Sequence, residues 1–162
     1  MTVPVHVPTR PYVGDARSTP IRLIVPALRI SIPLITLGLN SNGTVQVPST
    51  TTTAGWYRLG PTPGQIGSAV ILGHVDSYRG EGIFFFLRTL RAGQSIFVGL
   101  ADGHTVHFRV TAVTMFAKSA FPARQVYGSH GYSALQLVTC GGVFNRTTGS
   151  YESNIVVFSE RV

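Results

Sequence analysis

Cys140 and His74 are the two residues whose types and positions best fit nucleophilic chemistry. Cys140, the only cysteine, ends the apolar run LQLVTC and is followed at once by two glycines. His74 stands near the end of a second apolar run, SAVILGHV. A cysteine thiolate can attack a carbonyl group, and a neighbouring imidazolium lowers the thiol pKa and can transfer protons. Two strands that end side by side would make these residues a nucleophile and its acid–base partner.

The same two residues allow other interpretations. A lone cysteine is often a small buried apolar residue, so the chain could be a non-catalytic binding module of the cell envelope with Cys140 in its core. Another cysteine peptidase or transpeptidase is also possible. The L,D-transpeptidases usually keep histidine and cysteine close in sequence, however, whereas Cys140 follows His74 by 66 residues.

The composition predicts one compact, β-rich domain. The 162 residues are 44% hydrophobic and only 12% charged, which argues against disorder and against a coiled coil. The 18 glycines and 10 prolines indicate frequent turns and loops. The net charge is +7, but the basic residues are spread along the chain, so no nucleic-acid partner is expected. The six acidic residues are scattered, so neither a metal site nor a cofactor is expected.

The elements that must position Cys140 and His74 are short strands. We expect residues 1–20 to form an extended arm or linker and residues 21–162 to form the catalytic domain. A short helical turn is expected within 82–93, a polar segment over 117–134 and a loop over 141–153. The expected strands are 21–35 (one or two), 44–48, 68–75, 94–100, 104–116, 135–140 and 154–160. Their close spacing predicts an antiparallel barrel or sandwich.

Three segments resemble sortases, the cysteine transpeptidases of Gram-positive cell surfaces. LVTCGG at 137–142 resembles their cysteine strand, and residues 71–93 resemble their histidine segment. TTGSYESNIVVF at 147–158 resembles the strand that follows the cysteine loop. The details CGG-x-F-N-R-x-TG-x-Y and GHVDS are most similar to the class F sortases of actinobacteria. The resemblance covers about residues 20–162, in consistent order.

This resemblance implies an all-β fold, a closed barrel of roughly eight strands with one or two short helices. It implies that Cys140 attacks the Thr–Gly carbonyl of an LPxTG-like sorting signal and forms a thioester. His74 would act as general acid and then as general base. Thr139, in the cysteine motif, would contact the substrate. The family's arginine would hold the substrate carbonyl.

That arginine is where the chain departs from the family pattern. Its motif position is occupied by Asn154, and the nearest arginine is Arg146. We expect the loop 141–149 to fold back and bring Arg146 over Cys140, with Asn154 as the alternative.

The resemblance also implies partners and a location. The partners would be proteins with LPxTG-like sorting signals and an amine of a peptidoglycan precursor. The enzyme would work at the extracytoplasmic face of the membrane. It would be held there by an anchor segment upstream of residue 1, and this chain itself would not enter the membrane.

Overall fold

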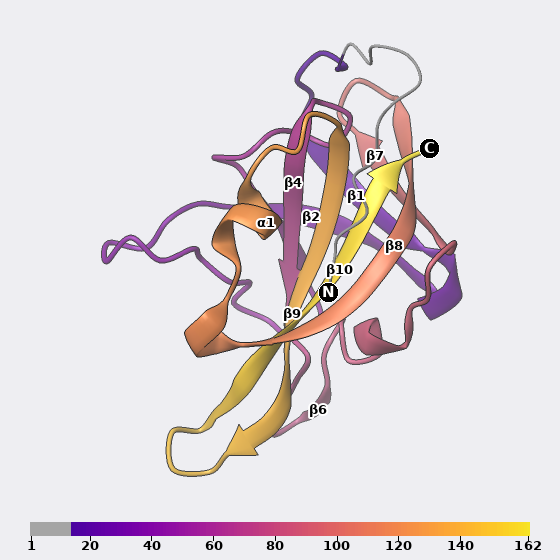
Figure 1. The fold of residues 1–162 in the computed structure, drawn as a ribbon. Helices are drawn as coiled ribbons and strands as arrows, with labels where there is room; N and C mark the ends of the chain where they lie inside the picture. The colour runs from indigo at the N-terminus through magenta and orange to yellow at the C-terminus, as the bar shows by residue number, and fades with distance from the viewer. Residues whose placement is uncertain (1–13) are drawn as a thin grey trace.

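The structure, a computed structural model, describes residues 14–162 (Figure 1). Eight strands close into a barrel in the order β1-β2-β3-β4-β9-β10-β8-β7, and β5 and β6 form a separate two-stranded sheet. The strands are β1 (Pro20–Val25), β2 (Ile30–Leu37), β3 (Ala54–Tyr57), β4 (Gly67–Gly73), β5 (Asp76–Ser77), β6 (Gly80–Glu81), β7 (Ser95–Leu100), β8 (Thr105–Ala117), β9 (Ser133–Asn145) and β10 (Ser150–Arg161). The all-β barrel predicted from the sequence is confirmed.

Helical structure in the described residues is short. One α-helix, α1 (Ala123–Tyr127), lies within the segment expected to be polar loop. The 3₁₀ turns are η1 (Pro26–Leu28), η2 (Leu87–Thr89) and η3 (Lys118–Ala120). The turn η2 falls inside the region 82–93 where a helical turn was expected.

The barrel buries apolar side chains on two sides of its β4–β9 wall. The interior holds a large cluster that includes Leu23, Ile71, Phe84, Phe108 and Leu137. On the outer face of the wall, beside α1, a second cluster surrounds four buried valines, Val70, Val126, Val138 and Val156. This double burial explains why β4 and the first half of β9 read as continuous apolar runs rather than alternating ones.

Two strand pairs of the barrel are parallel, β2 with β3 and β4 with β9. The antiparallel arrangement expected from the strand spacing is therefore wrong for these pairs. The chain between β4 and β9 is long enough to return to the end of the barrel where β4 starts, which a parallel pair requires. Because the carboxyl ends of parallel strands lie at the same end of a sheet, β4 and β9 deliver the residues that follow them to one place.

Other expectations fail locally. Residues 44–48 form no strand, only a single bridge between Val45 and Leu39, because the chain turns back through an Asn40 N–H···O=C Thr44 bond of 2.8 Å. Residues 54–57 form β3, which was not expected. The expected loop over 141–153 is the end of β9, a four-residue turn and the start of β10.

The expected arm lies partly outside the described residues, which begin at Gly14. Its described part is bound to the barrel. The N–H of Asp15 donates to the carbonyl of Gly64 at 3.1 Å, and the Arg17 guanidinium lies 5.3 Å from the centre of the Trp56 ring.

Candidate active site

Cys140 projects from the outer face of β9. Along this strand Leu135 and Leu137 belong to the barrel interior, whereas Gln136 and Val138 face the side of α1, where the Gln136 amide donates to the Val126 carbonyl. Side chains alternate along a strand, so Cys140 continues the outer set. Its side chain is half-buried, which leaves the thiol accessible.

The strand register brings His74 to the same end of the barrel as Cys140. The paired residues of β4 and β9 run from Gly67 with Ser133 to Leu72 with Val138, and each pair differs by 66 in residue number. The last pair is Leu72 with Val138, and His74 and Cys140 each follow it by two residues. The parallel pairing therefore delivers both residues to the same end of the barrel, His74 just past the end of β4 and Cys140 within β9.

A backbone carbonyl orients the His74 ring. Its Nε2 lies 2.6 Å from the carbonyl oxygen of Pro48, in the segment between β2 and β3. A carbonyl oxygen only accepts, so Nε2 carries a hydrogen in this arrangement and Nδ1 is left to exchange a proton. The backbone is fixed as well, because the N–H of Phe84 donates to the His74 carbonyl at 3.0 Å. Only glycine fits at position 82, where a Cβ would lie 2.4 Å from the His74 oxygen.

Asn154 lies on the other side of Cys140. It is the direct partner of Cys140 in the antiparallel β9–β10 ladder, and it shares the outer face of β10 with Val156 and Phe158. Its Nδ2 donates to the carbonyl of Thr139 at 3.2 Å, which leaves its second amide hydrogen free of that bond. Cys140 and Asn154 are thus paired on β9 and β10, and His74, which directly follows β4 on the other side of β9, completes the row of three candidate residues at this end of the barrel.

Arg146 is not brought to this row. It is an exposed residue in the turn between β9 and β10, and the strands remain paired up to Asn145 and Ser150. The expectation that residues 141–149 fold back over Cys140 is therefore wrong. Asn145 is five positions beyond Cys140 along β9, up to roughly 16 Å at the usual rise per residue. That distance is more than an arginine side chain spans.

The Thr139 side chain does not lie where a residue that contacts the substrate would be expected. Its side chain is 3% exposed and, by alternation, faces the barrel interior rather than the side that carries Cys140. Its hydroxyl has no hydrogen-bond partner within the described residues. The part of Thr139 that enters the site is its carbonyl, which accepts the Asn154 amide.

A β-bulge follows Cys140 immediately. Between the pairs Gly141–Ser153 and Phe144–Tyr151, β9 has two intervening residues and β10 has one. Gly142 takes φ +77°, a left-handed conformation that glycine adopts without strain. The bulge bends the hairpin just beyond the thiol, which explains why a glycine is needed there.

Tyr151 and Asp76 form a contact that sequence reasoning missed. The Tyr151 hydroxyl donates to Asp76 Oδ2 at 2.6 Å. This bond raises the pKa of Tyr151, with smaller contributions from burial and from the charges of Asp76 and Cys140. The phenol therefore stays protonated at neutral pH. The only sequence signal was the tyrosine of the TG-x-Y motif.

Aromatic and aliphatic side chains cover the outer face next to this row. They surround α1 and the neighbouring strands and are only partly buried, so part of this face is an apolar surface. They are Tyr57, Leu72, Phe116, Phe121, Tyr127 and Phe158.

Within residues 14–162 no group of three or more histidine, cysteine, aspartate or glutamate side chains could hold a metal ion. No helix among the same residues is long and apolar enough to cross a membrane.

The fold is similar to that of solved sortases. Sortase A from Corynebacterium diphtheriae, a lid mutant, superposes with a TM-score of 0.66 at 16% identity, over 91% of this chain and 72% of that one. Sortase C1 from Streptococcus agalactiae superposes with a TM-score of 0.67 at 19% identity, over 88% of this chain and 66% of that one. Sortase C-1 from Actinomyces oris superposes with a TM-score of 0.65 at 18% identity, over 89% of this chain and 75% of that one. The chain thus spans about two thirds to three quarters of these proteins.

At these identities the structural likeness concerns the fold alone. A search of curated protein sequences found no match. The sequence itself matches a family model, described as the sortase domain, over residues 23–162. That match runs from within β1 to the end of the chain and includes both His74 and Cys140, and on this ground the chain belongs to the sortase family.

Proposed function

We propose that this chain is a cysteine transpeptidase that cleaves an LPxTG-like sorting signal between threonine and glycine and transfers the signal-bearing protein to a cell-wall amine. Cysteine transpeptidation is the activity of the sortase family, to which the chain belongs. The observation that supports the proposal is that Cys140 pairs with Asn154 on β10, while His74 directly follows β4, the strand on the other side of β9.

In the first half-reaction the Cys140 thiolate attacks the carbonyl carbon of the threonine. The carbon–nitrogen bond to glycine then breaks, and the His74 imidazolium gives its proton to the departing amine nitrogen. The products are a thioester on Cys140, a free amino terminus that begins with glycine, and neutral His74.

In the second half-reaction an incoming amine attacks the thioester carbonyl. Neutral His74 takes a proton from this amine as the new amide bond forms, and the carbon–sulfur bond breaks to return the thiolate. The Pro48 carbonyl bonds Nε2–H in both states of the ring, so His74 can gain and lose its proton at Nδ1 without turning.

We assign the carbonyl-holding role to Asn154 rather than Arg146. Asn154 is level with Cys140 on the adjacent strand, and its amide retains a hydrogen to donate to an oxyanion. It brings no charge, so the charge-assisted stabilisation that an arginine would give is absent from this position.

The apolar outer face around α1 supports the choice of substrate. The leucine and proline of an LPxTG-like signal are apolar, and Phe116 of this face is the ladder partner of Asn154. A chain lying on this surface would reach the row from the side of α1.

Several finer assignments belong to the same proposal. The motif around Cys140 favours a class F enzyme of actinobacteria, with a peptidoglycan-precursor amine as acceptor. We propose that the protein works at the extracytoplasmic face of the membrane, held by an anchor segment upstream of this chain.

The test is mass spectrometry of the protein after incubation with an LPxTG-type peptide, with and without an added amine. We expect a thioester adduct on Cys140 that disappears when the amine is added, together with a peptide–amine product. The matched control is Cys140→Ala, which must show neither species. A chain that stays unmodified with every peptide, and whose thiol reacts slowly with alkylating agents at neutral pH, would instead be the non-catalytic module.

A further inference from the structure

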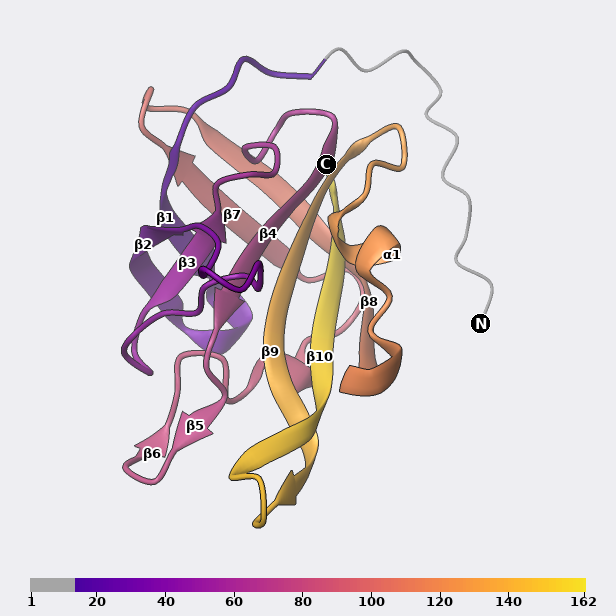
Figure 2. The same ribbon diagram turned by 90° about the vertical axis from the view of Figure 1, so that its left-hand side faces the viewer.

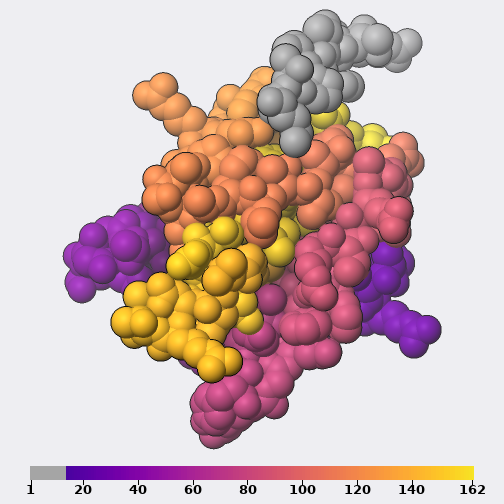
Figure 3. Space-filling model, turned by 60° about the horizontal axis from the view of Figure 1, so that its bottom comes forward, coloured from indigo at the N-terminus to yellow at the C-terminus, as the bar shows by residue number. Residues whose placement is uncertain are grey.

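Two hairpins project from the end of the barrel that carries Cys140 and His74. One is the β5–β6 hairpin, which begins two residues after His74, and the other is the β9–β10 hairpin beyond Cys140. Figure 2 shows both extending below the barrel. Figure 3 brings this end forward and shows the yellow β9–β10 hairpin beside the magenta β5–β6 segment.

A single side-chain bond joins these hairpins. The Tyr151 hydroxyl, on β10, donates to Asp76 Oδ2, on β5, at 2.6 Å, although the two residues are 75 positions apart. In the barrel β9 lies between β10 and β4, the strand that leads to β5. The bond therefore links the segment that follows β4 to β10, the strand paired with the one that carries Cys140.

The residues at both ends of this bond are themselves held. Asp76 pairs with Glu81 in the two-stranded β5–β6 sheet. The Tyr151 ring packs edge-on against Phe144, with ring centres 5.1 Å apart, on the paired strand of its own hairpin. The hydrogen bond to Asp76 raises the pKa of Tyr151, so the hydroxyl stays protonated as the donor.

We propose that the Tyr151–Asp76 pair is a positioning clasp that holds the segment following His74 against the cysteine strand. Asp76 is two residues from His74, so a fixed Asp76 limits how far the imidazole can move from Cys140. Tyr151 and Asp76 act through His74 and are positioning residues.

The expected effect of the clasp on catalysis rests on the proposed function, whereas its effect on hydrogen exchange does not. Loss of the clasp should lower kcat, because misplacing an acid–base group by about 1 Å can cost up to ~100-fold in rate. It should leave KM nearly unchanged, because the apolar face proposed to bind the sorting signal lies around α1 and is not part of the clasp.

The test uses Tyr151→Phe, Asp76→Ala and the double variant, each measured in two ways. Hydrogen–deuterium exchange of peptides covering residues 74–82 needs no substrate. Both single variants should speed exchange there to the same extent. In turnover assays with an LPxTG-type peptide and an amine, each should lower kcat roughly 10-fold or more. The double variant should be no slower than the slower single variant, because both changes remove one bond.

Two matched variants serve as controls. Tyr78→Phe removes a tyrosine hydroxyl from the tip of the β5–β6 hairpin, where the ring is 91% exposed, and should change neither measurement. Asp76→Asn retains an oxygen that can accept the phenol hydrogen, so it should keep most of the kcat that Asp76→Ala loses.

The proposal is overturned if Tyr151→Phe leaves exchange in 74–82 at the wild-type rate, if the two single losses add, or if KM rises while kcat is kept. If Asp76→Ala does not fold, the contrast between Tyr151→Phe and Tyr78→Phe decides. If even the wild-type protein turns over no peptide, the proposed function fails, and the exchange rates alone decide whether the clasp exists.

Discussion

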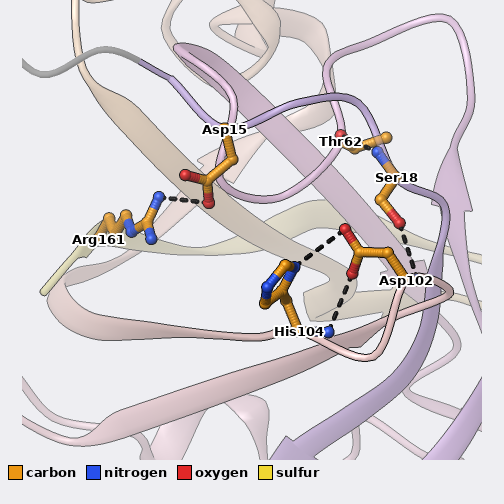
Figure 4. A network of polar contacts seen from close by, with 6 residues as sticks. All are labelled: Asp15, Ser18, Thr62, Asp102, His104 and Arg161. Carbon is orange, nitrogen blue, oxygen red and sulfur yellow. Dashed lines mark hydrogen bonds and ion pairs between the residues drawn. The ribbon is translucent and has the colours of Figure 1, made fainter.

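The two ends of the barrel each have a histidine two residues from an aspartate, but the two histidines are held in different ways. At the β7–β8 turn, His104 Nδ1 lies 3.1 Å from Asp102, and the His104 side chain is 82% exposed (Figure 4). At the opposite end His74 is half-buried and held by the Pro48 carbonyl, 26 residues away in sequence. His104 has only local partners, whereas His74 is fixed by the fold.

The polar network around His104 has a different role. Asp102 receives a hydrogen bond from the His104 N–H at 2.9 Å, and this bond together with the His104 side chain lowers the pKa of Asp102. Close by, Arg161 donates to Asp15 at 2.6 Å and the Ser18 N–H donates to the Thr62 hydroxyl (Figure 4). These bonds fasten the start of the described chain to the barrel.

The difference shows what makes a histidine reactive here. A histidine and a carboxylate in contact are common on protein surfaces and define no function. A nucleophile must lie on a neighbouring strand, and both side chains must be held in place, as the β4–β9 register holds His74 and Cys140.

The largest effect should come from removing the nucleophile. Cys140→Ala should abolish both peptide cleavage and transpeptidation, because no other cysteine exists in the chain. Far-UV circular dichroism should show a folded protein, since the substitution only shortens a half-buried side chain. Turnover at the wild-type rate would contradict the enzyme assignment altogether.

The two histidines should then separate the two ends of the barrel. His74→Ala should lower kcat/KM by several orders of magnitude, since each proton transfer is worth roughly 10²–10⁴-fold. His104→Ala should stay within about 2-fold of the wild type, because its exposed ring has only the neighbouring Asp102 as a partner. Steady-state kinetics on both variants measure these changes in kcat/KM. Equal losses in the two variants would contradict the predicted difference between the two histidines.

At the end of the barrel that carries Cys140, variants of Asn154 and Arg146 test which residue holds the substrate carbonyl. Asn154 has the matching position in the strand ladder, whereas Arg146 has the charge. Asn154→Ala should lower kcat/KM by roughly 10²-fold, the lower end of the effect of losing one oxyanion donor. Arg146→Ala should change it by less than about 3-fold, because the residue is exposed in the hairpin turn. The reverse order would return the role to Arg146 and require the hairpin to bend over the thiol.

The smallest effect concerns alkaline pH. Burial, and secondarily Tyr57, raises the pKa of Tyr127 to about 12. In the unfolded chain this phenol loses its proton near pH 10, so between pH 10 and 12 the unfolded state binds fewer protons and stability falls as pH rises. Thermal melts should show a shallower decline in Tm over this range for Tyr127→Phe than for the wild type. An identical decline would mean that Tyr127 does not contribute to it.

The sequence predicted the barrel and most strands because apolar runs and turn signals are local. It pointed to Cys140 and His74 by residue type and by their places at the ends of such runs. Their neighbourhood depends on a parallel pair with a long connection, and no local pattern encodes which strands pair.

The hairpin between Cys140 and Asn154 is a second case in which the sequence alone did not predict the structure. Its glycines and threonines read as loop, yet the Asn145 side chain accepts the N–H groups of Thr147 and Thr148 at 2.9 and 3.1 Å and closes a tight turn. That turn keeps the strands paired and holds Arg146 away from the thiol. The Tyr151–Asp76 bond is a tertiary contact and could not be read from the chain at all.

The parallel pairing of β4 and β9 also bears on how freely this protein can be altered. The ladder of backbone bonds sets the ends of β4 and β9 side by side, and the β7–β8 hairpin takes no part in that ladder. Insertions at the tip of the β7–β8 hairpin, around Asp102, should therefore leave the distance between the two side chains intact. A tag or a second domain could be grafted there without disturbing the catalytic geometry. By the same logic, two related chains could keep one active site while the number of residues between histidine and cysteine differs widely.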